Sequence, residues 1–376
     1  DDMLPEIINL ALNSSDRQAK VAASELLHSC IIVMIGTGAQ RSSETNERYP
    51  MAPLYRRVFA AMLQLSCDQD QVTRQLFLTL TFQTIHWFTN NRNFENPDTA
   101  VLLEAIMEGI VSANDPALRD ISAQGLAEFV KWSRKQNRNK DSSSINIKSI
   151  FKRIFSNLKH PSSFKRLGGC LAWNSIYREV REDEAVVDTW MLQLLVHLLE
   201  CLDLAEADDP ALGTHTQAAQ AVRHVQRILC VKKDLFNKSS NLRMAPIGAE
   251  GNTLNDVLLW LLNQCGKPKS LLRHSVMELI SSLAPHTVKA GGKSLYRNSC
   301  EFLKDNSKDG LEILVMMVEG GDRSNADGGG TCLGVSSLRE PAEHSIKHLT
   351  IFCEALLAAL DGYTWLLAQG VASPTK

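Results

Sequence analysis

The feature that most constrains this chain is a short pattern that opens one helical segment after another. In its clearest copy, Asp115 can cap a helix, Pro116 suits the first helical position, and Arg119 precedes apolar residues at helical spacing. The pattern recurs at intervals of about 50 residues, which predicts an array of helical repeats. The equivalent arginines are Arg17, Arg74, Arg119, Arg166 and Arg273, and Asp209-Pro210 is expected to open the helix missing from this series.

Such repeats predict an all-α fold, a HEAT/armadillo-type helical-repeat solenoid (an α-α superhelix). A single helix pair cannot bury its own apolar face, so neighbouring pairs stack into one elongated core. The alternative is a helical bundle whose caps look alike by chance. We expect residues 1–376 to form one continuous solenoid segment of a larger protein, with long loops near 36–53, 136–146, 232–253, 285–294 and 319–341.

Apolar residues recur at helical spacing along most of the chain, and strand-like alternation is nearly absent. The predicted helices are Gln18–Ile35, Leu54–Cys67, Val72–Thr89, Thr99–Val111, Ala117–Trp132, Ile147–Leu158, Ser163–Glu179, Glu184–Leu204, Thr216–Val231, Leu254–Cys265, Lys269–Leu283, Gly310–Val318 and Glu343–Leu367.

Composition and the N-terminal residues indicate the cellular compartment of the protein and whether the chain is part of a longer one. Nine cysteines are spread singly without a Cys-x-x-Cys pair, which indicates reduced thiols in a cytosolic or nuclear protein. Asp1 and Asp2 stand where a signal peptide would be basic, and the chain does not begin with Met, so we expect a piece of a longer protein. The apolar run from Leu26 to Ile35 is too short to span a bilayer.

The sequence motifs of common enzymes and metal sites are incomplete in this chain. Gly291-Gly292-Lys293-Ser294 resembles the end of a phosphate loop, but Thr287 occupies the place of its first glycine. His344 and His348 have a zinc-ligand spacing, yet no third ligand completes a site. We therefore predict no catalytic residue, no cofactor and no metal site in this segment.

One charged stretch stands out from a chain whose net charge is only −2. From Lys131 to Arg166, eleven basic residues are opposed by Asp141 alone, a local charge of +10. Downstream, from Arg178 to Asp209, ten acids oppose two arginines, a local charge of −8. Neighbouring repeats therefore carry opposite signs.

A basic edge of this kind can face nucleic-acid phosphates or an acidic protein partner. The alternative is ordinary solvated surface. The candidate contacts for nucleic acid or a partner are Lys131, Arg134, Lys135, Arg138, Lys140, Lys148, Lys152, Arg153, Lys165 and Arg166. Trp132, Trp173 and Tyr177 could stack on bases, but their helical spacing favours core positions.

Several longer stretches carry a family resemblance. They are Cys67-Asp-Gln-Asp-Gln-Val-Thr-Arg-Gln-Leu76, Ile85-His-Trp-Phe-Thr-Asn-Asn91, His160-Pro-Ser-Ser-Phe-Lys-Arg-Leu-Gly168 and Asn174-Ser-Ile-Tyr-Arg-Glu179. Together they resemble the family of DNA-dependent protein kinase catalytic subunits, giant members of the phosphatidylinositol-kinase-like protein kinases. The resemblance implies a place in the N-terminal or middle HEAT region, well before the kinase domain.

The resemblance also implies a function for the parent protein. It would be a nuclear, ATP- and magnesium-dependent serine/threonine kinase of double-strand-break repair by non-homologous end joining. Its cradle would hold double-stranded DNA ends together with the Ku heterodimer, and this segment would be scaffold within the cradle. A stand-alone HEAT-repeat adaptor or transport receptor that binds protein partners is the alternative, and a small independent enzyme is disfavoured by the failed motifs.

Overall fold

The structure is a computed structural model that describes residues 3–44, 51–90, 97–137, 145–265, 269–288, 294–299 and 301–302, with isolated positions at 357, 360 and 364. The chain divides into two compact units, Asp1–Asp183 and Glu184–Lys376. The predicted helices Gly310–Val318 and Glu343–Leu367 and the predicted loop 319–341 lie outside the continuously described ranges.

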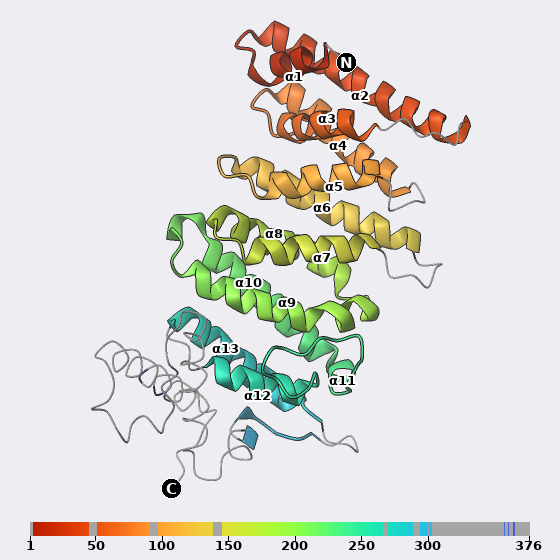
Figure 1. The fold of residues 1–376 in the computed structure, drawn as a ribbon. Coiled ribbons are helices and arrows are strands. Elements are labelled where there is room, and N and C mark those ends of the chain that lie inside the picture. The colour runs from red at the N-terminus through yellow and green to blue at the C-terminus, as the bar shows by residue number, and fades with distance from the viewer. Residues whose placement is uncertain are drawn as a thin grey trace, which may run out of the picture. The chain divides into compact units, whose positions relative to one another are not determined.

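The first unit consists of helices joined in consecutive pairs (Figure 1). The first pair is α1 with α2, and α3 with α4, α5 with α6 and α7 with α8 follow. Their bounds are α1 Leu4–Asn13, α2 Arg17–Glu44, α3 Ala52–Leu65, α4 Gln71–Asn90, α5 Pro97–Ile110, α6 Pro116–Asn137, α7 Ile145–Leu158 and α8 Ser163–Val180.

Stacking between pairs builds the core of this unit. The first helices α1, α3 and α5 contact one another in succession, and so do the second helices α2, α4, α6 and α8. Between these two rows, Phe59, Phe77, Phe129 and Trp173 are completely buried. Each apolar stripe is thus covered by a neighbouring pair, as a solenoid requires.

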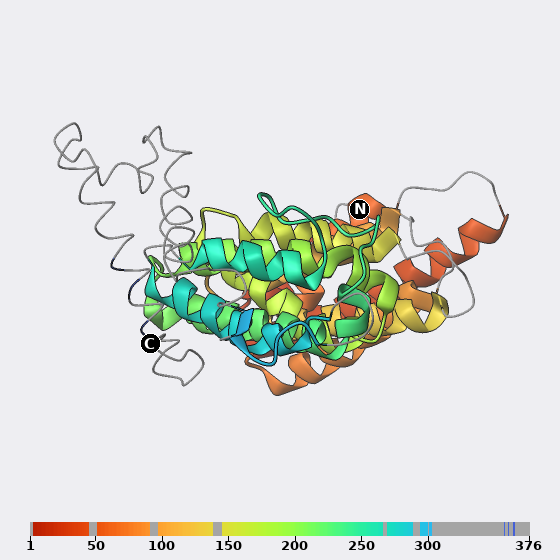
Figure 2. The same ribbon diagram turned by 90° about the horizontal axis from the view of Figure 1, so that it is seen from below.

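The second unit continues the same kind of pairing. Helices α9 (Glu184–Ala205) and α10 (Thr214–Val231) pack together, and α12 (Leu254–Gln264) packs on α13 (Ser270–Leu283), teal in Figures 1 and 2. Short elements η1 (Pro210–Leu212), α11 (Lys233–Phe236) and η2 (Ala284–His286) connect them. Among the described residues, β-structure is limited to one isolated bridge between Val288 and Ser294. The predicted fold class, an all-α helical-repeat solenoid, is confirmed.

The aspartate of the recurring sequence pattern caps the helix that follows it. The carboxylates of Asp16, Asp70 and Asp115 accept hydrogen bonds from backbone N–H groups in the first turns of α2, α4 and α6, at 3.0 to 3.2 Å. These bonds satisfy donors that a helix start leaves open. Two hydrogen bonds to the Asp70 carboxylate lower its pKa to about 2. The larger effect comes from the backbone N–H of Thr73 and the smaller from the side chain of Arg17.

The arginine of the pattern clamps the turn before its helix. Arg74 donates to the carbonyl oxygen of Asp68 at 2.9 Å, and Arg119 donates to that of Ser112 at 2.7 Å. Arg166 donates to the carbonyls of His160 and Pro161, both at 2.7 Å. The clamp thus satisfies carbonyls that the preceding helix and turn leave without a helical partner.

Two assignments within this repeat series were wrong. Arg17 is the first residue of α2 and bonds to the Asp70 side chain at 2.9 Å, so it does not clamp its own turn. Asp209-Pro210 opens only the short η1, because Gly213 takes a left-handed conformation with φ of 74° and α10 begins after it.

The predicted loop 36–53 was also wrong in its first part, because α2 continues to Glu44. Glycines at 36 and 38 suggested a break, but Gly38 serves close packing inside a helix. A Cβ at Gly38 would lie 2.8 Å from the hydroxyl oxygen of Tyr55, and that hydroxyl donates to the Met34 carbonyl at 3.2 Å. Helix α1 and the short α11 were missed altogether.

Two of the described helices have the length and hydropathy of a membrane span, the Arg17–Gly38 part of α2 and the whole of α9. Of the α9 window, 61% is buried inside the protein, and α9 contacts α10 and α13 as a core helix does. The α2 window is 22% buried and carries exposed Leu26, Ile32 and Val33.

Candidate partner interface

The predicted basic residues come from three consecutive helices of the first unit. Lys131, Arg134 and Lys135 lie on the last turns of α6, and Lys148, Lys152 and Arg153 lie on α7. Lys165 and Arg166 belong to the first turn of α8. Arg138 and Lys140 lie outside the described residues.

Three of these cations are paired with acids that stand outside the basic stretch. Lys131 lies 2.8 Å from a carboxylate oxygen of Glu128. Arg134 lies 3.7 Å from Asp183, and Arg153 lies 3.4 Å from Glu104 of α5. The count of +10 therefore overstates the charge that this surface presents.

Two further residues are engaged at the start of α8. Arg166 is only 6% exposed, and its guanidinium clamps the α7–α8 turn. The Nζ of Lys165 lies 3.4 Å from the Nε2 of His160 in that turn. Arg166 has a structural task there, although the predicted contact of either residue with a partner is untested.

The remaining cations of the prediction that the structure describes are Lys135, Lys148 and Lys152, and all three are exposed. We call them the exposed lysine set. Lys148 and Lys152 are four residues apart on α7 and therefore share one face of that helix. The Nζ of Lys135 lies 4.4 Å above the ring of Trp132, a cation–π contact.

Sequence reasoning missed the acid that organises the end of α6. Glu128 accepts hydrogen bonds from the Nζ of Lys131 at 2.8 Å and the indole Nε1 of Trp132 at 3.0 Å, and it lies 3.4 Å from the Nε2 of His86. Partial burial opposes ionisation, but these bonds outweigh it and lower the pKa of Glu128. The spacings to Lys131 and Trp132 could have shown this cluster, whereas His86 comes from α4.

Trp173 and Tyr177 are core residues, as their spacing indicated. Trp173 is fully buried and Tyr177 is 8% exposed. Trp132 is half-buried, because its ring packs 4.5 Å from the ring of His86 and carries Lys135 on its face.

The acidic run from Arg178 to Asp209 is also partly paired. Glu184 lies 2.9 Å from the Nζ of Lys232, and Asp203 lies 3.7 Å from that of Lys269. Asp188 is buried against Arg243. The count of −8 is therefore reduced by cations further along the chain.

In the part of the chain that the structure describes, no cluster of His, Cys, Asp and Glu could hold a metal ion. His344, His348 and the Gly291–Lys293 segment fall outside the described ranges. The described cysteines are free thiols. Burial, followed by the charges of Asp115 and Asp120, raises the pKa of Cys67 to about 11, which disfavours the reactive thiolate.

A surface depression of about 440 Å³ lies on the second unit between α10 and α13. Its lining includes Arg223, Arg227, Glu278 and His286. Glu278 lies 3.8 Å from Arg223 and offsets part of its charge.

Stacked helix pairs and clamped turns define the class of this chain as a helical-repeat protein. Comparison of its sequence with known proteins identifies the family. Residues 49–376 match the family model described as "DNA-dependent protein kinase catalytic subunit, CC1/2". The chain belongs to this family, which confirms the resemblance.

Relatives support the assignment along the whole chain. The DNA-dependent protein kinase catalytic subunit of Gallus gallus is 42% identical over 380 residues, and that of Xenopus laevis is 41% identical over 376. The protein of the same name from Dictyostelium discoideum is 31% identical over 411 residues. These matches cover 98–100% of the chain but only 9% of each relative, so the chain spans about a tenth of their length.

Proposed function

We propose that this chain is a scaffold segment of a giant nuclear serine/threonine kinase of DNA double-strand-break repair by non-homologous end joining. In this proposal it helps to form the cradle that holds double-stranded DNA ends and the Ku heterodimer. ATP and magnesium would act in a kinase domain elsewhere in the parent protein. Family membership over the whole chain supports the parent's identity.

The observation that carries the DNA-contact part of the proposal is the exposed lysine set. Lys135, Lys148 and Lys152 remain exposed on α6 and α7 after nearby acids have paired with Lys131, Arg134 and Arg153. Exposed lysines with flexible stems suit phosphate contacts, which depend on charge and require no particular base sequence.

Stacked repeats also suit the transmission of movement. Within a unit, each helix pair contacts mainly its neighbouring pair, so small rotations between pairs add up along that unit. A load on one end of a unit would then shift the other end of that unit, and no separate hinge would be needed.

The test uses the full-length parent protein with Lys135, Lys148 and Lys152 changed to glutamate. We expect DNA-stimulated phosphorylation to require more DNA for half-maximal activity, because three attractive charges become repulsive. A matched control changes three exposed cations outside the basic stretch to glutamate as well: Arg57, Arg227 and Lys233. Equal DNA requirements for the two triple variants and the wild type would refute the assigned contact.

A further inference from the structure

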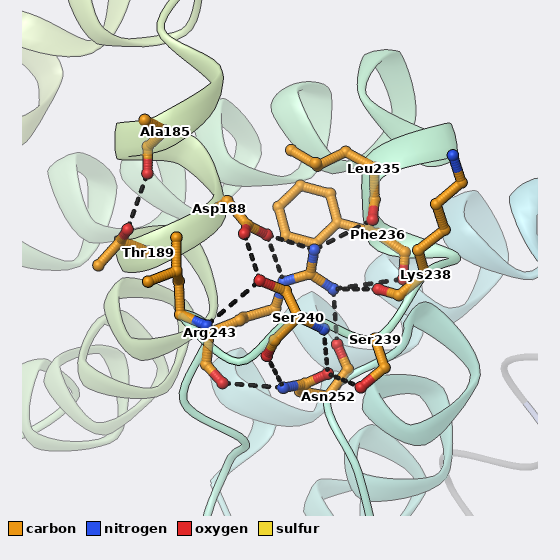
Figure 3. Close-up of polar contacts among 11 residues, drawn as sticks. Ala185, Asp188, Thr189, Leu235, Phe236, Lys238, Ser239, Ser240, Arg243 and Asn252 are labelled. Atoms are coloured by element: carbon orange, nitrogen blue, oxygen red, sulfur yellow. Dashed lines mark hydrogen bonds and ion pairs between the residues drawn. The ribbon is translucent and has the colours of Figure 1, made fainter. Parts of the chain in front are cut away.

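The loop between α11 and α12 in the second unit is built around one buried arginine. The side chain of Arg243 is fully buried, and its Nε donates to a carboxylate oxygen of Asp188 on α9 at 3.0 Å (Figure 3). A second guanidinium nitrogen of Arg243 bonds to the same oxygen. The loop is therefore fastened to a core helix by a largely buried ion pair.

The remaining donors of Arg243 hold the backbone on both sides of the loop. They bond to the carbonyl oxygens of Leu235 at 3.0 Å, Lys238 at 3.1 Å and Asn252 at 2.8 Å. The guanidinium also lies 4.4 Å from the centre of the Phe236 ring. One side chain thus joins the beginning of the loop to its end.

Asn252 adds a second fastening. Its amide nitrogen donates to the carbonyl oxygens of Ser240 at 2.7 Å and Arg243 at 2.8 Å, and its amide oxygen accepts from the Ser240 backbone at 3.3 Å. The Ser240 hydroxyl in turn donates to Asp188. A partly buried network in which these polar groups are satisfied specifies one loop conformation.

This fixed backbone turns apolar side chains outward. Leu242 is 64% exposed, Met244 is 62% exposed and Ile247 is 94% exposed. From Ser239 to Ala249, the sole ionisable side chain is Arg243, and it is buried against Asp188. Between the exposed Lys238 and Glu250, whose charges are opposite, the loop therefore offers solvent an apolar surface without charge, which neither phosphates nor an acidic surface would attract.

We infer that Leu242, Met244 and Ile247 form a docking element for an apolar groove between helices elsewhere in the same long polypeptide. This inference rests on the proposed function, in which the chain is one segment of a giant protein. Patches of exposed apolar side chains mark interaction sites, and a rigid loop loses little conformational entropy when it docks.

The size of the patch favours an occupant in the same polypeptide over a separate protein. Each partner in a stable complex covers about 800 Å², far more than three side chains provide. A groove tethered to the loop faces it at a high effective concentration, so a small contact suffices. Relatives about eleven times as long as this chain, which covers 9% of them, contain ample sequence for such a groove.

Photo-crosslinking in the full-length protein tests the inference. A photoreactive phenylalanine analogue replaces Ile247, whose exposure makes the change harmless to packing, and in a control it replaces Val231, which is 77% exposed on α10. We expect the Ile247 position to crosslink within one polypeptide to an apolar helical segment outside residues 1–376. Adding Leu242→Ser and Met244→Ser should lower this yield by about tenfold or more, since each loses its apolar burial.

Three outcomes would overturn the inference: crosslinks from Ile247 to a separate protein, crosslinks to phospholipid when vesicles are present, or a yield no higher than from Val231. None of them concerns the exposed lysine set. The DNA requirement of the lysine variant is measured separately, so the proposed function can survive a failed docking experiment.

Discussion

The two units use arginine in contrasting ways. In the first unit, Arg74, Arg119 and Arg166 each clamp a short turn by donating to neutral carbonyl oxygens. In the second unit, Arg243 holds a long loop by pairing with the ionised carboxylate of Asp188 inside the protein. The difference lies in what a substitution leaves behind: a carbonyl that water can often reach, or a buried charge.

The largest expected effect tests this contrast at Arg243. Replacing Arg243 by methionine keeps much of the volume but leaves Asp188 buried without its cation, which should lower the free energy of unfolding of this region by about 3–5 kcal/mol. Hydrogen exchange of the amides in α9 and α12 would measure the loss. Adding Asp188→Leu should recover part of it, and an effect below about 1 kcal/mol would mean that the pair behaves as surface.

A second prediction concerns how closely the clamped turns let helices approach. A Cβ at Gly168 would lie 2.5 Å from a side-chain carbon of Val111 and 3.0 Å from the carbonyl oxygen of Ile110. Gly168→Ala should therefore destabilise the first unit by about 1–3 kcal/mol through overpacking. Gly36→Ala is the matched control, because Gly36 lies in α2 with no atom within 4 Å of its added Cβ. That change should stabilise by up to about 1 kcal/mol, and equal effects at the two sites would contradict the packing described.

A third prediction compares two clamps of the same type. Arg166 is 6% exposed, whereas Arg74 is exposed to solvent. Arg166→Met should lower the stability of the first unit by about 1–3 kcal/mol, because the carbonyls of His160 and Pro161 lose a charged donor in a partly buried turn. Arg74→Met should cost less than about 1 kcal/mol, since water can replace its bond to Asp68. Thermal denaturation of the two variants would rank them, and the reverse order would show that burial does not set the strength of the clamp.

The smallest expected effect is a pH dependence at the start of α4. The folded-state pKa of Asp70 is about 2, below its ordinary value of 3.8. A depressed carboxylate pKa contributes stability that is fully present above the ordinary value and is lost as the pH falls towards 2. Exchange of the Thr73 amide should therefore accelerate over this range. Asp70→Asn should remove the dependence, and an unchanged pH profile in that variant would assign the effect to another group.

Local patterns along the chain predicted much of the fold. Helices α8 and α13 were expected within one residue of their observed ends, because a turn-forming segment precedes each and apolar periodicity continues to the last turn. Asp115 was correctly expected to cap α6. Errors arose where a glycine has a packing role, as at Gly38, or where a left-handed residue intervenes, as at Gly213.

The candidate site was less predictable, because its charges are sorted by tertiary contacts. Arg153 finds Glu104 49 residues away, and Arg243 finds Asp188 55 residues away. Spacing along the sequence cannot predict ion pairs between residues so far apart. A count over consecutive residues therefore identifies a basic stretch of sequence, but it could not separate the paired cations from the exposed ones.

That separation is the central claim, and the salt dependence of DNA binding by the full-length protein tests it most directly. Two variants would be compared with the wild type: Lys135, Lys148 and Lys152 changed to glutamine, and Lys131, Arg134 and Arg153 changed to glutamine. Each phosphate contact contributes about 0.9 to the slope of log affinity against log salt. We predict that changing the exposed lysine set to glutamine reduces the slope by about 3. Changing Lys131, Arg134 and Arg153 should leave the slope nearly unchanged. Equal slopes for the two variants, or a larger loss from the paired set, would contradict the account.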